Sequence, residues 1–283
     1  MNLTQSYDIT GETVIDLNGH ELTADLSNAL FNVNGGKLTL KGGTASNRKQ
    51  VALVSNGGEV IVEDGTYTSS KAAAFRAGVE GTVTVNGGTL TGQEGAVDSR
   101  GSSANGCKAK ITINGGHLTG LDNFAVATNG STNMGGNIIT INGGTLEGNI
   151  KSPGYEAIGV YVANDDTFIM NGGEIIAHGG TGICMRGGNV TINAGTITAT
   201  NVDKNGETVA DGKIGDNDTV LTGCSAIVYH RLAGYSGMNG MSLTIKGGTI
   251  TGIDHSIDVI SDEETPQIFV TGGILTPTYP EVA

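Results

Sequence analysis

The acidic residues that could bind a metal ion gather in one polar stretch of the sequence. Its carboxylates are Asp203, Glu207, Asp211, Asp216 and Asp218. Carboxylate oxygens are hard ligands of the kind that Ca²⁺ prefers. The stretch lacks the D-x-D-x-D-G order of a dedicated calcium loop, so a flexible acidic loop is the simpler interpretation. We therefore expect no cofactor. If a metal ion binds, Ca²⁺ is the candidate, and Asp211, Asp216 and Asp218 are its weak candidate ligands.

A second set of residues could bind a ligand through planar and hydrogen-bonding groups. Equivalent positions in successive short segments are occupied by Asn56, Gly78, Arg100, Asn129, Tyr161, Arg186, His230 and Ile260. If these side chains stack, they offer ring surfaces and fixed donors, which suit glycan binding. A solvated sheet face is the alternative. The candidate binding residues are Arg100, Asn129, Tyr161, Arg186 and His230.

The composition excludes several classes of protein. The chain has 283 residues, 48 Gly but only 4 Pro, 4% aromatic residues and no Trp. Its net charge of -13 argues against a nucleic-acid partner, because phosphate contacts require basic patches. Cys107, Cys184 and Cys224 fit neither a disulfide framework nor a zinc site, so we expect buried thiols. No apolar run is long enough to span a membrane, and we see no signal peptide at the N-terminus.

One motif recurs along almost the whole chain and determines the fold that we predict. Its clearest copy is Ile-Ile-Thr-Ile-Asn-Gly-Gly-Thr-Leu-Glu-Gly at 138–148. The second Gly of the motif recurs mostly every 22 to 29 residues, with one gap of 53 residues. The copies fall at Gly43, Gly65, Gly88, Gly116, Gly144, Gly173, Gly195, Gly248 and Gly273. A period of this length indicates a solenoid.

Each repeat contains three short segments with the alternation of β-strands. In 82–86, Val83 and Val85 fall on one face and the polar residues on the other. A second apolar column follows the glycines, as at Leu90 and Leu118, and a third strand such as 53–56 lies between the motifs. We therefore predict an all-β fold: a right-handed parallel β-helix of about ten coils with three strands per coil, roughly 50 Å long. We expect the recurring Asn of the motif to form a structural ladder of side-chain amides.

We expect one domain, residues 1–283, with three irregular parts. These are an N-terminal cap or tail at 1–13, an insertion loop at 200–224 and a C-terminal tail at 276–283. Pro277 and Pro280 in the tail would stop a strand ladder from growing.

The stretch Thr-Val-Ile-Asp-Leu-Asn-Gly-His-Glu-Leu at 13–22 and the repeated Thr-Ile-Asn-Gly-Gly units resemble right-handed β-helix proteins of the pectate-lyase-like superfamily. More narrowly, they resemble non-catalytic, glycine-rich repeats of gut bacterial surface proteins and of phage appendages. The resemblance covers nearly the whole chain. It implies the fold and leaves the function open, because this fold serves lyases, hydrolases, adhesins and fibres.

The resemblance raises two catalytic hypotheses. Hydrolases of the superfamily use neighbouring Asp residues with a His-Gly and a basic residue, for which Asp165, Asp166, His178 and Arg186 are weak candidates. Asp166 and His178 are only 12 residues apart, so we expect them on different faces, with the Asp pair in a solvated turn.

The lyases need clustered Asp ligands for Ca²⁺ and an Arg base. Arg76 and Asp98 could share one outward column, with Asp258 farther along the rod. We expect Val54 and Ala127 as their neighbours in that column, which leaves too few oxygens for a calcium site.

We favour a non-enzymatic surface protein that presents a rigid face to glycans or a host surface. Within that class we predict a phage virion fibre or capsid decoration protein, located on the virion or the cell surface. The alternatives are a polysaccharide lyase or glycoside hydrolase, and a trimmed bacterial adhesin module. The partners considered are a glycan or surface receptor, other virion or surface proteins at the rod ends, and further copies of the chain, as in a trimer.

Overall fold

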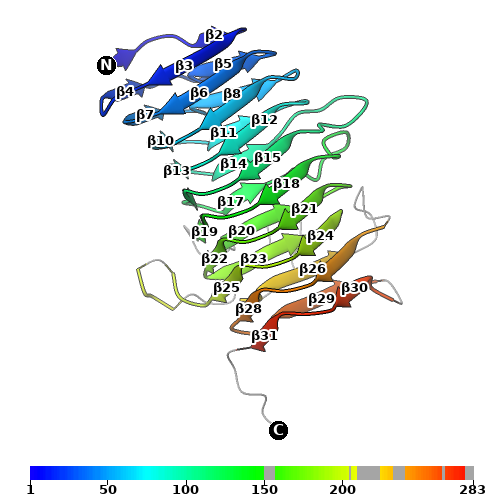
Figure 1. Ribbon diagram of the computed structural model, residues 1–283. Helices are drawn as coiled ribbons and strands as arrows, with labels where there is room; N and C mark the ends of the chain where they lie inside the picture. Colours follow the sequence, from blue (N-terminus) through cyan, green and yellow to red (C-terminus); the bar gives the residue numbers. More distant parts are fainter. Residues whose placement is uncertain (150–156, 204, 209–223, 232–239, 263–264, 278–283) are drawn as a thin grey trace.

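The computed structural model is a parallel β-helix, as predicted (Figure 1). It describes residues 1–149, 157–203, 205–208, 224–231, 240–262 and 265–277. Within these ranges every regular element is a strand, and none of them is a helix that could cross a membrane. The chain winds through three sheets in turn, so that each strand pairs with the strand three places later.

The sheets are named A, B and C here, and all their neighbouring strands are parallel. Sheet A contains β1 (Asn2–Leu3), β4 (Glu21–Ala24), β7 (Thr44–Asn47), β10 (Thr66–Ser69), β13 (Thr89–Gly92), β16 (His117–Gly120), β19 (Thr145–Asn149), β22 (Glu174–His178), β25 (Thr196–Thr200), β28 (Thr249–Gly252) and β31 (Ile274–Pro277). Sheet B contains β2 (Tyr7–Ile9), β5 (Phe31–Asn34), β8 (Ala52–Ser55), β11 (Ala73–Ala77), β14 (Gly95–Ser99), β17 (Phe124–Ala127), β20 (Ala157–Val162), β23 (Gly180–Met185), β26 (Ile227–Arg231) and β29 (Ile257–Ser261). Sheet C contains β3 (Glu12–Asp16), β6 (Lys37–Lys41), β9 (Glu59–Val62), β12 (Thr82–Val85), β15 (Lys110–Ile113), β18 (Ile138–Ile141), β21 (Thr167–Met170), β24 (Asn189–Ile192), β27 (Ser242–Ile245) and β30 (Ile268–Val270).

The core is a set of apolar columns that run along the rod axis. In sheet C, Val83 pairs with Val60 on one side and Ile111 on the other, and all three are buried. In sheet A, Leu90 occupies the equivalent place between Tyr67 and Leu118. The predicted inward columns are therefore confirmed. Burial of branched side chains in every coil is the main source of stability in such a stack.

The glycines of the motif make the bend between sheets C and A. Gly144 has a φ of 86°, which favours glycine, and a Cβ there would lie 2.8 Å from the carbonyl oxygen of Gly116. Gly116 has a φ of 91° and would meet Gly88 in the same way. The coils thus pack backbone against backbone at this bend, which explains the repeated glycine.

The predicted ladder of asparagine side chains is present beside these bends. Each Nδ2 donates to the Oδ1 of the preceding coil at 2.8 to 2.9 Å. The ladder consists of Asn86, Asn114, Asn142, Asn171 and Asn193. At its first rung, Asn86 donates to Glu63 at 2.9 Å.

The irregular parts differ in detail from the prediction. Residues 1–13 contain β1, β2 and the start of β3, so they already form the first coil. Thr276 and Pro277 belong to β31 and pair with β28, so the tail begins later than expected. Within the insertion, the described residues include one antiparallel bridge between Val202 and Thr208.

Sheet B departs from simple inward and outward alternation. Every residue of β14 and β23 is buried, including those whose side chains point away from the core. Ile158, Cys184 and Val228 form a separate apolar cluster on this outer side. Cys107, Cys184 and Cys224 are buried free thiols, as expected.

Candidate binding groove

One outward column on sheet B brings polar residues of successive coils together. Asp8 pairs with Asn32, Asn32 with Leu53, Leu53 with Arg76, and Arg76 with Asp98. Because the strands are parallel and in register, these side chains repeat at about 4.8 Å along the rod. The predicted proximity of Arg76 and Asp98 is therefore confirmed. The expectation that Val54 lies next to them in this column is wrong, because Leu53 occupies the column and Val54 belongs to the core.

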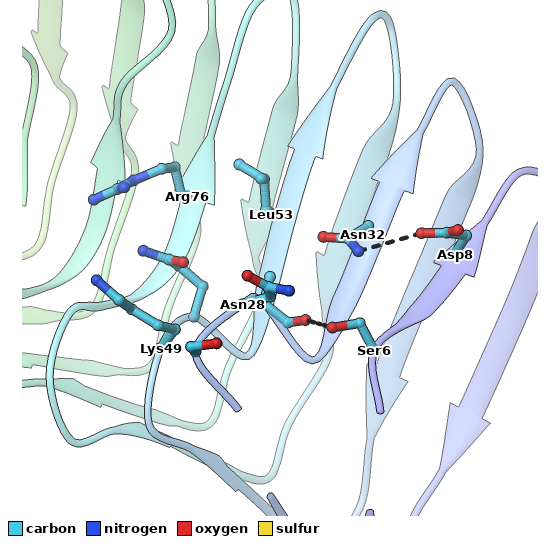
Figure 2. A pocket seen from close by; sticks show the side chains of 10 residues that line it. Ser6, Asp8, Asn28, Asn32, Lys49, Leu53 and Arg76 are labelled. Carbon is cyan, nitrogen blue, oxygen red and sulfur yellow. Dashed lines mark hydrogen bonds between the residues drawn. The ribbon is translucent and has the colours of Figure 1, made fainter. Parts of the chain in front are cut away.

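The first four residues of this column line a groove of about 470 Å³ (Figure 2). Its other side comes from the turns that lead into sheet B. The lining residues are Ser6, Asp8, Ser27, Asn28, Ala29, Asn32, Lys49, Gln50, Leu53 and Arg76. The groove thus crosses four successive coils, from β2 to β11, and is elongated along the rod axis.

Hydrogen bonds fix both sides of the groove. Asn32 Nδ2 donates to Asp8 Oδ1 at 3.2 Å, and Ser6 Oγ donates to the carbonyl oxygen of Ala29 at 2.7 Å. Figure 2 shows these two contacts facing each other across the groove.

The turn wall is organised by a buried residue that lies outside the groove. Asn47 Nδ2 donates to the carbonyl oxygens of Asn28 at 2.8 Å and Gln50 at 2.9 Å. Its Oδ1 accepts from the Leu26 N–H at 2.9 Å. One side chain therefore ties together the turns of two coils. Our sequence reasoning missed Asn47, and the only signal is a polar residue at a position that is apolar or small in most other coils.

Arg76 closes one end of the groove and is held by acidic partners. Its Nε and Nη2 donate to the two carboxylate oxygens of Asp98 at 2.8 and 2.5 Å. Its Nη2 also lies 3.9 Å from a carboxylate oxygen of Glu94. Burial acts to lower the pKa of Arg76, but the hydrogen bonds and charge of Asp98, helped by Glu94, outweigh it and raise that pKa. The guanidinium is therefore fixed in place and firmly protonated.

The groove can form hydrogen bonds of both senses with a bound molecule. Asp8 supplies acceptors, Lys49 supplies donors, and Asn32 and Gln50 carry amides that can do both. Leu53 adds an apolar patch in the floor between Asn32 and Arg76. Such a mixture suits a hydroxyl-rich molecule better than a purely apolar one.

The five predicted binding residues do not form one exposed column. Arg100 is exposed and Asn129 half-buried, where the Asn129 Oδ1 accepts from the Ser131 N–H at 2.9 Å. Tyr161 pairs with Ala127 and Cys184, so it belongs to the column of Arg76 and Asp98 instead.

Arg186 and His230 adjoin each other but are only 7% and 1% exposed. Arg186 Nε donates to His230 Nδ1 at 3.3 Å. Burial, together with the charge of Arg186, lowers the pKa of His230 to about 4, so the imidazole is neutral at pH 7. The expectation that these two side chains face solvent is wrong.

The catalytic candidates Asp165, Asp166 and His178 remain apart. Asp165 Oδ1 accepts from the Gly136 N–H at 2.8 Å just before β21 in sheet C, whereas His178 ends β22 in sheet A. Asp166 is fully buried, so the expected solvated turn is wrong at this position. Its Oδ1 accepts from both the backbone and side-chain N–H of Asn137 at 2.8 Å. This geometry gives Asp166 a role in joining coils.

The metal candidates Asp211, Asp216 and Asp218 lie outside the described residues. Asp203 and Glu207 are described, and there Asp203 Oδ1 accepts from the N–H groups of Asn205 and Glu207 at 2.8 and 2.9 Å. These hydrogen bonds lower the pKa of Asp203, and the bond from the Glu207 N–H has the largest effect. In the part of the chain that the structure describes, no three His, Cys, Asp or Glu side chains are close enough to hold a metal ion.

Comparison of the chain with protein-family models, with curated proteins and with solved structures gives no match, so the fold and the groove are assigned from its own residues and geometry.

Proposed function

We propose that this protein is a non-enzymatic recognition rod that binds a saccharide chain in the groove on sheet B. The observation that carries the proposal is the line of hydrogen-bonding side chains from Asp8 to Arg76 across four coils. The coil spacing of ~4.8 Å is comparable with the length of one hexose unit. An extended saccharide along the rod axis would therefore present successive sugar units to successive coils.

The stiffness of the scaffold favours this kind of ligand. Asp8, Asn32, Leu53 and Arg76 stand on strands, and the opposite wall is fastened by Asn47. A groove that is already ordered loses little conformational entropy on binding. Weak contacts repeated along a polymer can then add up to useful affinity.

A lyase is the competing candidate, because Arg76 and Asp98 adjoin on one face. A base in such a reaction must lose its proton, whereas the raised pKa of Arg76 opposes that loss. The guanidinium edge formed by Nε and Nη2 is also engaged, because both nitrogens donate hydrogen bonds to Asp98. Binding is therefore the function that this geometry supports better.

In the wider setting we propose a phage virion fibre or capsid decoration protein, or a surface module of a bacterium. The support is the resemblance of the repeats to such proteins and the acidic charge of -13, which favours solubility. Either setting would use the rod to hold the groove away from its point of attachment.

The test is a screen of soluble neutral and acidic polysaccharides for binding by calorimetry, with release of reducing ends followed in parallel. We expect binding without turnover, weakened about tenfold by Asp8→Ala or Lys49→Ala. Lys71→Ala, which removes an exposed lysine that does not line the groove, is the matched control. Turnover that Asp98→Ala abolishes would make the protein an enzyme, and binding that only Arg100→Ala weakens would place the site elsewhere.

A further inference from the structure

Among the described residues, the last coil has apolar side chains exposed at the end of the core. Its strands β29, β30 and β31 are the final members of sheets B, C and A (Figure 1). Each pairs with the preceding coil on one edge, while half of the backbone N–H and C=O groups of an end strand point to the open edge. Such an edge can pair with a further strand.

Apolar side chains are exposed at this end for a specific reason. Val259 and Val270 are 44% and 49% exposed, although they continue the inward columns of Tyr229 and Ile245, which are 0% exposed. Their exposure therefore belongs to the cross-section of the core and not to the outer faces of the sheets. Phe269 and Ile274, exposed at 52% and 62%, enlarge the apolar patch at its rim.

The first coil offers a surface of matching shape. Its strands β1, β2 and β3 are the opening members of the same three sheets. Thr13 and Ile15 begin the inward columns that continue to Leu38 and Leu40, and both are only half-buried. The two ends of the rod thus present the first and the last strands of the same three sheets, and they lie at opposite ends of the stack in Figure 1.

We propose that the last coil of one copy docks on the first coil of a second copy, head to tail. The contact would extend each sheet by the parallel pairing that already joins neighbouring coils: β31 to β1, β29 to β2 and β30 to β3. In sheet C, Val270 would then meet Ile15 of the second copy. Because the two surfaces differ, the contact does not close on itself and generates a linear rod of several copies.

Charge opposes this contact and makes it dependent on salt. The strands of the first coil carry Asp8, Glu12 and Asp16, and each copy has a net charge of -13. Repulsion between copies is screened as the ionic strength rises. Apolar end-to-end docking should therefore strengthen with added salt, whereas a contact driven by ion pairs would weaken.

The experiment measures mass by light scattering after gel filtration, across protein concentrations and at low and high salt. We expect a series of species at multiples of 28.6 kDa that grows with both variables, and rods of stepwise length by electron microscopy. Val270→Asp and, separately, Val259→Asp should each reduce the association constant at least tenfold. Ile138→Asp, at an apolar residue 41% exposed midway along the rod, should leave it unchanged. Circular dichroism of each variant reports whether the β-helix is retained.

Mixing distinguishes the direction of the contact. Copies with Val270→Asp keep an intact first coil, so they should cap the rods of unaltered protein and shorten them. Monomers at every concentration and salt would overturn the proposal. A series that stops at dimers would also overturn it, because that pattern means that two identical ends meet. The same holds if the folded Val270→Asp and Val259→Asp variants associate as strongly as the unaltered protein.

Discussion

Arg76 on β11 and Asp98 on β14 form a bidentate ion pair across two neighbouring coils, with contacts of 2.8 and 2.5 Å. The side chains are only 17% and 4% exposed. The pair therefore marks where the open groove ends and the buried outer face of sheet B begins. A charge in such a position is tolerated only because its partner is present.

Asp98→Asn should destabilise the protein by about 3 kcal/mol, because it leaves the Arg76 charge partly buried without its carboxylate. Urea unfolding followed by circular dichroism measures this loss. The control is Asp262→Asn, which removes the acid of the more exposed Arg231–Asp262 pair and should cost less than about 1 kcal/mol. Equal losses for the two variants would contradict our account of the buried pair.

The asparagine ladder gives a second prediction, based on counting hydrogen bonds. Asn142→Ala removes both the bond to Asn114 and the bond from Asn171, whereas Asn193→Ala removes the bond to Asn171. At about 0.5–1 kcal/mol per partly exposed bond, Asn142→Ala should cost about twice as much as Asn193→Ala. Urea unfolding of the unaltered protein and of both variants measures the two losses, each as a shift of the midpoint from that of the unaltered protein. A larger loss at Asn193 would show that the ladder is not the source of the effect.

Much of the fold could be predicted because the alternation of apolar residues and the spacing of the glycines indicate the same structure. The alternation in 82–85 places Val83 and Val85 inside, and the recurring glycines fix where the chain bends. The predicted alignment of the strands in sheet B was wrong at Tyr161. It placed this residue in the column of Arg100, two residues away from its true column with Ala127 and Cys184. The turns between sheets B and C differ in length from coil to coil, so counting from one glycine does not align the strands of sheet B.

The groove could not be predicted because its wall depends on contacts between turns. The bonds from Asn47 to Asn28 and Gln50 join segments 19 and 3 residues away, and no local pattern reveals the first. The burial of Arg186 and His230 was missed for a related reason. Alternation shows which side chains point outward, but not whether the outer face is covered. Apolar Cys184 and Val228 on that face were the signal that it is not solvated.

His230 provides a prediction about acid sensitivity. Its pKa is lowered to about 4 by burial and by Arg186, so the folded protein binds this proton less readily than the unfolded chain does. The stability contributed by the neutral imidazole is therefore complete above the ordinary pKa of 6.5 and is lost as the pH falls toward 4. NMR should show the His230 ring neutral down to about pH 5. His230→Gln should remove this part of the acid sensitivity, and an imidazole that titrates near 6.5 would contradict the prediction.

The contribution of Asp166 to stability should depend on pH in the opposite direction from that of His230. Burial raises its pKa to about 7, against the lowering effects of Thr128 and Asn137, and the charge of Asp165 adds to the rise. Buried Cys107 also interacts with Asp166, but burial raises the pKa of this thiol to about 11, so it is neutral across this range. Between about pH 4 and 7 the folded protein holds a proton on Asp166 that the unfolded chain has released.

The difference in bound protons determines whether the free energy of unfolding rises or falls with pH. Where the folded state holds the extra proton, the free energy of unfolding falls by up to about 1.4 kcal/mol per pH unit as the pH rises. Asp166→Asn keeps an acceptor for Asn137 and cannot ionise. The variant should therefore match the unaltered protein near pH 5 and exceed it in stability at pH 8, as measured by thermal unfolding across that range. Because all other groups are shared, the difference between the two curves isolates Asp166. A difference that is constant from pH 5 to 8 would mean that this carboxyl is already ionised at pH 5 in the folded protein, so that burial does not raise its pKa.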